Sequence, residues 1–419
     1  MTGGRPLGLR LALALACALG LPGPGVAAAP GTATPEAGSA AAPAPVTPAA
    51  PAAAPPTAAS PATQPRPAAS PARRAASQAA ARTTVPRASE RQRQTSANAS
   101  RTGPLYAGRE DVLRFAAELA ERRGWDRAWV ERQLGQARQL AVVQRLIMPA
   151  PAGTAKNWAA YRARFIEPRR IQAGMAFWDA HASALERAQA RYGVPAELVV
   201  GIIGVETFYG RIMGDFRALD ALATLSFDFP TGRRDRTPFF RSELEELLAF
   251  ARRENIEPGS LKGSFAGALG LPQFMPGSIN RHAVDFDGDG HIDLIANPVD
   301  AIGSVAHYLA AFGWQRGMPT HYEVTPPADE AARAVLLGPD ILPSFSAAQM
   351  QELGAQLPPA ARLHEGPMAL VLLENGGAAP SYVAGTQNFY AVTRYNWSSY
   401  YALAVIDLGA EIARARARR

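Results

Sequence analysis

The feature that most constrains this chain is a short stretch that is apolar on every side of a helix. Residues 198–205 read LVVGIIGV, so the helix expected from Pro195 onward has no polar face and must be buried. Gly193 is suited to end a preceding helix, and Pro195 to begin the new one. Each of the two glycines inside the run costs about 1 kcal/mol in a helix, which predicts that a neighbouring backbone packs closely against them. The rest of the folded chain must therefore surround this helix.

A single acidic residue, Glu206, ends the apolar stretch. Apolar surroundings disfavour the charged form of a carboxyl group, so they raise its pKa and keep a proton available near neutral pH. Such a group can protonate the oxygen that leaves a broken glycosidic bond. The alternative is that Glu206 only marks the helix end and points to water or pairs with Arg211.

The N-terminal part of the 419-residue chain differs in composition from the rest. Residues 1–29 combine a short basic start, the apolar run LALALACALGL and small residues, which predicts a secretory signal peptide. Cys17, the only cysteine of the chain, lies inside this segment. We favour cleavage beyond Cys17, which leaves a mature protein without disulfides. The alternative is a lipid anchor on Cys17.

Residues 30–102 are rich in Ala, Pro, Ser, Thr, Gln and Arg and almost lack large apolar side chains. Such a segment cannot bury enough surface to offset its ordering entropy, so we expect a disordered, partly polyproline spacer. Its arginines supply much of the net charge of +7. We interpret it as a solvated tether; weak attraction to an anionic envelope polymer or membrane surface is the alternative. Nothing in the chain indicates nucleic-acid binding.

The folded part is expected to be mainly α with a small β part. Helical periodicity dominates from residue 103 to residue 319. Between residues 320 and 393, the runs HYEV, MALVLLE and FYAVT predict strands of a small inserted β domain. Residues 394–419 return to a helix, and no transmembrane helix is expected after the signal peptide.

Individual helices follow from the same periodicity and from capping residues. Asp220 is expected to cap the helix that follows it, because Asp accepts hydrogen bonds from free amides of the first turn. The main helices are expected over residues 109–120, 126–134, 158–165, 171–192, 220–227, 238–255, 297–313 and 398–415.

Two further stretches carry side chains suited to binding a sugar. Residues 263–278 read GSFAGALGLPQFMPGS, where Ser264 and Gln273 can hydrogen-bond a carboxylate or an acetamido group. An ordinary glycine-rich loop is the alternative. Residues 394–401 read RYNWSSYY, whose rings suit pyranose faces and whose Asn396 suits a hydroxyl or acetamido group; the same residues could instead be core.

The stretch DFDGDGHID, residues 285–293, matches a calcium loop of the EF-hand type. In such a loop the side chains at positions 1, 3 and 5 bind the ion, and here these are Asp285, Asp287 and Asp289. Position 7 contributes a backbone oxygen, which here belongs to His291. Position 12, where a bidentate Glu is expected, is Ala296, so we expect Asp300 in the next helix to close a longer loop. The alternative is an acidic turn without metal.

In order and spacing, the motifs GVET, KGSFAGALGLPQFMP, DFDGDGHID and RYNWSSYYA resemble the membrane-bound lytic transglycosylase B family. The likeness spans residues 158–408. Enzymes of that family cleave the MurNAc–GlcNAc β-1,4 bond of peptidoglycan and leave a 1,6-anhydro-MurNAc end without consuming water. The resemblance implies a lysozyme-like helical core with a helical domain and a small β domain, a structural calcium ion and no organic cofactor. On this basis we divide the helical part into a helical domain over residues 103–193 and a helical core over residues 194–319.

The resemblance also assigns residues. Glu206 matches the single catalytic acid and base, and the family's calcium loop is longer than standard, which fits closure by Asp300. The segment 229–240 looks longer than usual, so roles for Arg233 and Arg234 in binding peptide or sugar are left open. The cleft residues that the motifs match are Tyr161, Ser264, Gln273, Tyr308, Tyr395, Asn396 and Tyr401.

The number of carboxyl groups also favours a lytic transglycosylase, because a sugar hydrolase normally needs two of them. Besides Glu206 the stretch offers Asp215 and Asp220, and the second is expected to be a cap. With one carboxyl group, the acetamido group of the substrate must stabilise the anomeric carbon and the C6 hydroxyl of MurNAc must attack it. Glu206 then donates a proton and takes one back.

The alternatives are a hydrolytic muramidase and a non-catalytic, calcium-stabilised protein that binds peptidoglycan. We expect a periplasmic monomer that acts on glycan strands and reaches a membrane only if it is lipidated, with other cell-wall enzymes as candidate partners.

Overall fold

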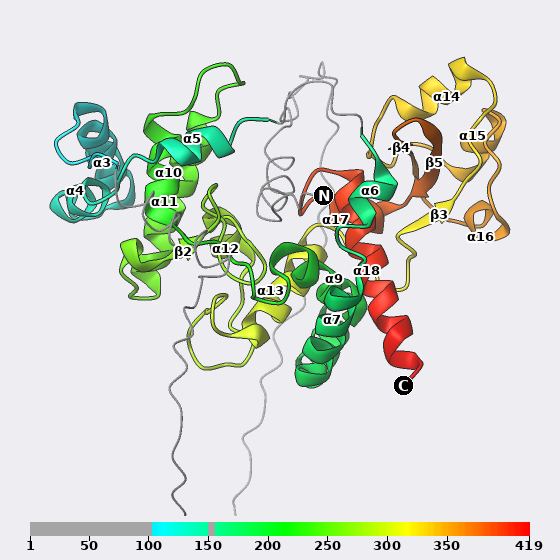
Figure 1. The fold of residues 1–419 in the computed structure, drawn as a ribbon, viewed down its shortest axis with the longest axis horizontal. Helices are drawn as coiled ribbons and strands as arrows, with labels where there is room; N and C mark the ends of the chain where they lie inside the picture. Colours follow the sequence, from blue (N-terminus) through cyan, green and yellow to red (C-terminus); the bar gives the residue numbers. More distant parts are fainter. Residues whose placement is uncertain (1–102, 150–155) are drawn as a thin grey trace, which may run out of the picture. The chain divides into compact units, whose positions relative to one another are not determined.

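The computed structural model describes residues 103–149 and 156–419. The expected signal peptide, Cys17 and the spacer lie outside the described residues. Most of the described chain is helical (Figure 1), as the periodicity predicts. The helices are α3 Glu110–Arg123, α4 Arg127–Gly135, α5 Ala141–Leu146, α6 Trp158–Arg162, α7 Pro168–Ala180, α8 Ala182–Tyr192, α9 Ala196–Thr207, α10 Ala218–Phe227, α11 Thr237–Arg253, the 3-10 helix η2 Pro258–Ser260, α12 Pro276–His282, α13 Pro298–Ala311, α14 Glu330–Leu337, α15 Ala347–Glu352, α16 Pro359–Arg362, α17 Gln387–Thr393 and α18 Ser399–Ala417.

The apolar helix, α9, is buried in the larger hydrophobic core, and α7, α8, α13 and α18 pack against it. Where α18 meets α9, a Cβ atom on Gly201 would lie 2.4 Å from the Val405 carbonyl oxygen. A Cβ atom on Gly409 would lie 2.2 Å from the Glu197 carbonyl oxygen. Only glycine allows the two backbones to approach this closely. The close backbone packing that was expected at both glycines of the run is confirmed at Gly201. At Gly204 it is wrong, because the nearest atoms belong to the side chains of Tyr209 and Leu408.

One expected helix is two helices. The periodic stretch 171–192 was expected to be continuous, but α7 and α8 are separated at His181, whose φ of −124° and ψ of 23° leave the helical region. The two halves then pack against different partners, α7 against α18 and α8 against α13. Periodicity cannot detect a break of one residue when both halves remain amphipathic. Gly193 ends α8 in the left-handed conformation, with φ of 74°, as predicted.

The expected role of Asp220 as a helix cap is wrong. The helix α10 begins at Ala218 with Arg217 as its N-cap, so Asp220 lies within the first turn and is fully buried. Its carboxylate accepts a hydrogen bond of 3.0 Å from the Arg138 backbone amide and pairs with the Arg217 guanidinium at 3.3 Å. A buried amide needs an acceptor, and Asp220 supplies one to a segment far away in the sequence.

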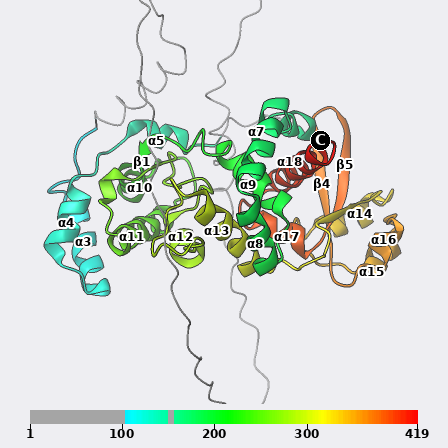
Figure 2. The ribbon, with the colours of Figure 1, turned by 90° about the horizontal axis from the view of Figure 1, so that it is seen from below.

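Residues 320–393 contain the expected small sheet. Its strands are antiparallel in the order β3-β5-β4, and Figure 2 shows β4 and β5 as neighbours. A second, smaller hydrophobic cluster includes Leu370 and Ala384 of this sheet and Leu336 of α14. The strands are β3 His321–Glu323, β4 Ala369–Asn375 and β5 Ala378–Gly385, and a separate two-residue pair joins β1 Phe216–Arg217 to β2 Lys262–Gly263.

The run FYAVT was expected to be a strand but forms most of α17. The Thr386 hydroxyl caps this helix by accepting a hydrogen bond of 3.1 Å from the Asn388 amide. Phe389 and Val392, three residues apart, are both fully buried. The strand that sequence analysis missed is β5, the hairpin partner of β4. The domain boundaries that the sequence suggests remain a prediction.

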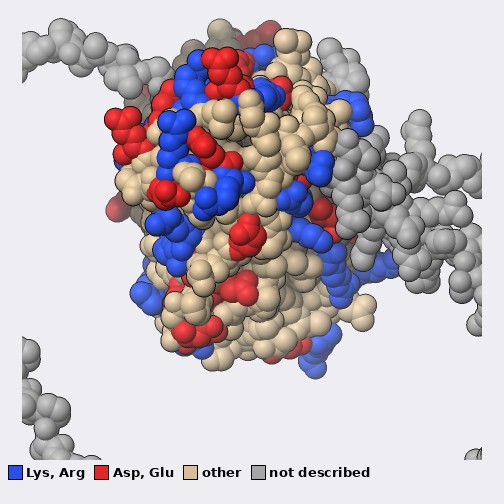
Figure 3. All heavy atoms as spheres, turned by 90° about the vertical axis from the view of Figure 1, so that its left-hand side faces the viewer, with Lys and Arg blue, Asp and Glu red and all other residues tan. Residues whose placement is uncertain are grey.

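The surface near α3, α4 and α11 mixes the two signs of charge (Figure 3). Arg122 and Arg123 of α3 both pair with Glu245 of α11, and Arg123 also pairs with Glu246. Basic side chains here are therefore balanced by nearby carboxylates. In the described part of the chain, no helix is both long enough and apolar enough to cross a membrane.

Candidate active site

Glu206 lies in the last turn of α9 and is partly buried. The two residues after Thr207 leave the helix in the left-handed conformation, with φ of 53° at Phe208 and 59° at Tyr209. For residues other than glycine this conformation costs about 1–2 kcal/mol each. Such backbone is held only when the surrounding structure determines it, and it is enriched at functional sites. A tightly turned backbone therefore follows directly after the carboxyl group.

Tyr401 holds the Glu206 carboxyl group. It lies in the first turn of α18, whose N-cap Ser398 accepts a hydrogen bond of 3.3 Å from the Tyr401 amide. The Tyr401 hydroxyl donates a hydrogen bond of 2.6 Å to Glu206 Oε1. Burial raises the pKa of Glu206 to about 7, and the hydrogen bond from Tyr401 opposes part of that rise. At neutral pH the carboxyl group can therefore both donate and accept a proton.

Two more of the expected tyrosines stand beside Tyr401. The ring of Tyr395 stacks on that of Tyr401 with centroids 6.2 Å apart, and Tyr308 lies 4.9 Å from Tyr395. Their hydroxyl groups are tied to the backbone: Tyr395 donates to Pro272 O at 2.6 Å, and Tyr308 donates to Arg394 O at 2.7 Å. Burial raises the pKa of both phenols, so they stay protonated. The structure thus assembles an aromatic wall next to Glu206, in which Tyr401 and Tyr308 are buried and Tyr395 is partly exposed.

Tyr161 and Asn396 border this wall. Tyr161, on α6, is partly buried, and its ring lies 5.8 Å from that of Tyr400. Its phenol is close enough to Tyr401 to contribute to the raised pKa of that residue, after burial, Glu206 and Tyr395. Asn396 is 5% exposed, so most of it belongs to the core.

The glycine-rich loop 263–278 is attached to the end of α9 by Thr207, whose hydroxyl donates to the Leu271 carbonyl at 3.0 Å. Within the loop, Ser264 Oγ accepts from the Ala268 amide at 3.0 Å, and Gln273 Nε2 donates to Gly270 O at 2.9 Å and to Met213 O at 3.1 Å. Both side chains therefore shape the loop. The Ser264 hydroxyl proton and the Gln273 amide oxygen are the groups suited to a ligand.

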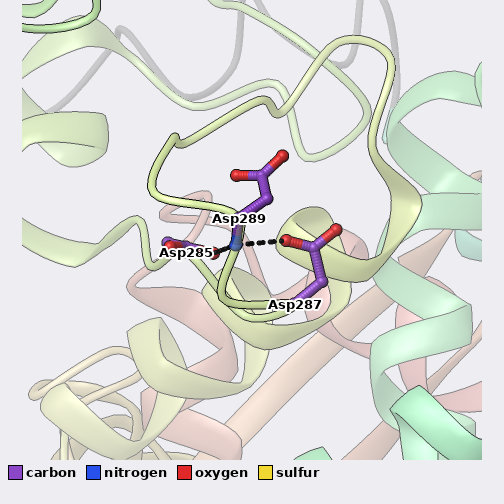
Figure 4. Close-up of side chains that lie close together, drawn as sticks. All are labelled: Asp285, Asp287 and Asp289. Carbon is purple, nitrogen blue, oxygen red and sulfur yellow. Dashed lines mark hydrogen bonds between the residues drawn. The ribbon is translucent and has the colours of Figure 1, made fainter.

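The acidic loop carries three carboxylates that could hold a cation. One oxygen from each of Asp285, Asp287 and Asp289 lies within 4.8 Å of the others. Figure 4 shows how Asp285 and Asp287 both accept hydrogen bonds from the Asp289 amide, at 3.2 and 3.3 Å. Hard oxygen donors converging on one loop suit calcium. The donor set therefore fits the ion that the sequence pattern suggests.

Asp300, on α13, closes this loop through hydrogen bonds. Its buried carboxylate accepts from the Phe286 amide at 2.8 Å and from the Asp293 amide at 2.9 Å. It stands apart from the three converging carboxylates, and the side chain of His291 points its Nδ1 toward Glu254 at 3.6 Å. Asp300 therefore sets the span of the loop, and its role as a metal ligand, like that of the His291 backbone oxygen, remains a prediction.

Comparison with known proteins decides the family. A family model described as a transglycosylase SLT domain matches residues 108–410. The chain belongs to this family. It is 42% identical to membrane-bound lytic murein transglycosylase B of Escherichia coli (strain K12) over 327 residues, which cover 76% of this chain and 87% of that protein.

Solved structures agree with this family assignment. Soluble lytic transglycosylase SltB1 from Pseudomonas aeruginosa is 41% identical, with a TM-score of 0.66 over 73% of this chain and 99% of that one. Lytic transglycosylase Slt35 from Escherichia coli, solved in complex with bulgecin A, is 41% identical with a TM-score of 0.66 over 76% and 98% of the two chains. Slt35 has also been solved in complex with calcium. The expected mainly helical, lysozyme-like fold is confirmed.

Some features around the candidate site could not be found from the sequence. Thr207 belongs to the GVET motif, yet nothing in the sequence indicated that its hydroxyl joins α9 to the glycine-rich loop. Arg233 of the long segment donates to the Ile147 carbonyl, so part of its role is to hold that segment. A cavity of about 450 Å³ near the end of α18, between Trp178 and Arg416, contains only Asp179 as a carboxylate, and this is paired with Arg416 and Arg419. That cavity therefore offers no free acid.

Proposed function

We propose that this member of the family cleaves the MurNAc–GlcNAc β-1,4 bond of peptidoglycan and leaves a 1,6-anhydro-MurNAc end. The class of enzyme, a lytic transglycosylase acting on peptidoglycan, follows from the family. The observation that carries the mechanism is the setting of Glu206: burial and the Tyr401 hydroxyl account for its pKa of about 7. No second carboxyl group of the described residues contributes to that shift.

The other carboxyl groups considered from the sequence are not suited to be a second catalytic acid. Asp220 is buried and bound to Arg138 and Arg217. Asp215 is exposed to solvent. A hydrolase with one carboxyl group lacks the base or nucleophile that its second step requires. This favours attack by the substrate itself over hydrolysis by water.

The reaction then has two proton transfers through one residue. Protonated Glu206 donates to the glycosidic oxygen as its bond to the MurNAc anomeric carbon breaks, and the 2-acetamido group stabilises the positive charge on that carbon. The Glu206 carboxylate next accepts the proton of the MurNAc C6 hydroxyl, whose oxygen forms the new bond. The residue returns to its starting state and no water is consumed. A pKa near the working pH serves both transfers.

We further propose that the glycan strand lies against the aromatic wall next to Glu206 through the partly exposed Tyr161 and Tyr395. The buried Tyr308, Tyr401 and Asn396 support the wall from behind. Ser264 and Gln273 present their remaining polar atoms from the glycine-rich loop to the acetamido group. Sugar faces pack well on such rings because these combine apolar surface with a polar edge.

Calcium is proposed as a structural ion. Asp285, Asp287, Asp289 and the His291 backbone oxygen would hold it, with Asp300 fixing the loop. Neutralising clustered carboxylates would stiffen the connection between α12 and α13. The complex of Slt35 with calcium supports the choice of ion.

The product distinguishes the proposal from its alternatives. Purified chain is incubated with peptidoglycan sacculi, and the released muropeptides are measured by mass spectrometry. Anhydro ends, lighter by one water than reducing ends, are expected. Reducing ends throughout would show a hydrolytic muramidase, and binding without release would show a non-catalytic protein. We place the enzyme in the periplasm after export, and a lipid at Cys17 would be needed to anchor it to a membrane.

A further inference from the structure

Arg170, on α7, is a buried cation behind the turn that follows Glu206. Its side chain is 6% exposed. In the described part of the chain it makes no ion pair, and its guanidinium donates instead to the backbone carbonyl of Gly204. Glu167, three residues earlier, favours this charge without forming an ion pair. Burying a charge without an ion pair is unfavourable unless other groups compensate. The position therefore calls for an explanation beyond ordinary packing.

Two kinds of compensation surround the guanidinium. The Gly204 carbonyl belongs to the last turn of α9, where the negative end of the helix dipole favours a cation. The rings of Phe208 and Phe165 lie 4.6 and 5.4 Å from the guanidinium carbon, within the range of cation–π attraction. Gly204 and Phe208 each lie two positions from Glu206 in the chain. Arg170 thus contacts a backbone carbonyl before the carboxyl-bearing residue and an aromatic ring after it.

The same face of α7 also holds Tyr209. Its ring lies 5.3 Å from that of Phe177. Its hydroxyl occupies the space that a side chain on Gly174 would need, only 2.5 Å from where a Cβ atom would stand. Arg170, Gly174 and Phe177 are spaced four and three residues apart, so they lie along one side of the helix. Three residues of one helix face therefore contact both left-handed residues, Phe208 and Tyr209.

We propose that Arg170 is a positioning residue for Glu206. With Gly174 and Phe177 it clamps the left-handed turn of Phe208 and Tyr209, and the clamp keeps the last turn of α9 wound. The Gly204 carbonyl accepts both from Arg170 and from the Phe208 amide at 3.2 Å, so loss of the guanidinium removes one of the two hydrogen bonds that hold this carbonyl and frees the end of α9 from α7. The carboxyl group then loses its alignment with Tyr401. This inference rests on the proposed role of Glu206.

Arg170→Met tests the clamp, because methionine keeps much of the side-chain length and apolar contact and removes the hydrogen bond and the charge. We expect kcat on glycan strands to fall about tenfold or more, since a small misplacement of a reacting group is costly. KM is expected to stay within about twofold, because Arg170 touches the turn and not the substrate. Arg170→Lys keeps the charge without the planar group and is expected to restore only part of kcat.

Val130→Ala is the matched control. Val130 is fully buried in α4, away from α7 and α9 in the chain, so its truncation lowers stability without touching the clamp. Rates are normalised to the folded fraction, measured by circular dichroism. The control is expected to keep the wild-type kcat even where its melting temperature falls as far as that of Arg170→Met.

Phe208→Leu is a second test of the clamp, because it removes the ring that the Arg170 guanidinium covers. Phe208 is only partly buried, so we expect this variant to fold. If Arg170→Met does not fold, a fall in kcat for folded Phe208→Leu still supports the clamp. Wild-type kcat in folded variants at both positions overturns it. Glu206→Gln is measured in parallel: if that variant retains activity, the proposed function fails, whereas an inactive Glu206→Gln beside fully active Arg170 variants removes only the clamp.

Discussion

The Tyr401 hydroxyl donates a 2.6 Å hydrogen bond to Glu206 Oε1, and the two residues are 195 positions apart in the chain. Glu206 ends α9, Tyr401 begins α18, and the helices meet where Gly201 faces Val405. The alignment of donor and acceptor is therefore set by how closely two backbones approach.

Tyr401→Phe removes the hydrogen bond and keeps the ring. That bond lowers the pKa of Glu206 against the effect of burial, so its loss is expected to raise the pKa above about 7. The pH at which activity is lost through deprotonation of the acid should therefore move upward. We also expect kcat to fall about tenfold because the carboxyl group is no longer held in place. The measurement is kcat as a function of pH on purified glycan strands.

Tyr400→Phe is the control for Tyr401→Phe, since the Tyr400 hydroxyl donates to Glu374 O instead. Identical profiles for Tyr401→Phe and the wild type would contradict the prediction.

Glu206→Gln is expected to abolish muropeptide release and to retain sacculus binding. It also changes how stability depends on pH. Glu206 has a pKa of about 7 in the folded chain and 4.5 as its ordinary value, so the unfolded chain binds fewer protons between these values. Its contribution to stability is therefore fully present below pH 4.5 and is lost as pH rises to 7. Against the wild type, the variant should be equally stable at pH 4 and more stable at pH 8 by about 1–3 kcal/mol, allowing for partial solvent access. Urea unfolding at both pH values measures this, and a constant difference between the proteins would refute the raised pKa.

Gly201→Ala tests the contact between α9 and α18. Alanine is intrinsically better than glycine in a helix by about 1 kcal/mol. Here its Cβ atom would meet the Val405 carbonyl oxygen at 2.4 Å, so the helices must separate. Overpacking of this kind typically costs about 1–3 kcal/mol, and we expect a lower melting temperature and lower kcat. Gly135→Ala in α4 is the control: its nearest contacts are an ordinary 3.6 Å, so its stability should be unchanged or slightly higher. Equal effects at the two positions would argue against tight backbone packing at Gly201.

Calcium is expected to raise the melting temperature, and a chelator to reverse the rise. An ion that binds only the folded chain stabilises it by about 2.7 kcal/mol at one hundred times its dissociation constant. Asp289→Asn should remove most of this response, because Asp289 is one of the three converging carboxylates. Asp179→Asn is the control, because Asp179 pairs with Arg416 and Arg419 and is not one of the converging carboxylates. This variant should respond to calcium as the wild type does. The melting temperature is measured by thermal unfolding with and without the ion. If neither calcium nor the chelator changes the melting temperature of the wild type, the proposed metal site is wrong.

Local patterns in the sequence were sufficient for much of the fold. The apolar run 198–205 predicted a fully buried helix, Gly193 predicted the end of α8, and Asn297 predicted the start of α13, whose first amides it caps. The spacing of carboxylates in residues 285–289 predicted their convergence. In each case the interacting groups lie within a few positions of one another, so the residues themselves carry the information.

Errors arose where a distant partner decided the outcome. Asp220 was expected to cap its own helix and instead accepts a hydrogen bond from Arg138, and the run FYAVT has strand propensity but is buried as a helix. Local propensity is a weak preference that packing readily overrides.

From the sequence alone came the proposal that Glu206 is the acid, the apolar setting that raises its pKa, and the resemblance to the lytic transglycosylase family. The tertiary structure alone showed that Tyr401 holds that acid and that Arg170 lies behind it. The reason is physical: burial and helix formation depend on neighbouring side chains, whereas a hydrogen bond between α9 and α18 depends on the register of two helices that only the whole core sets.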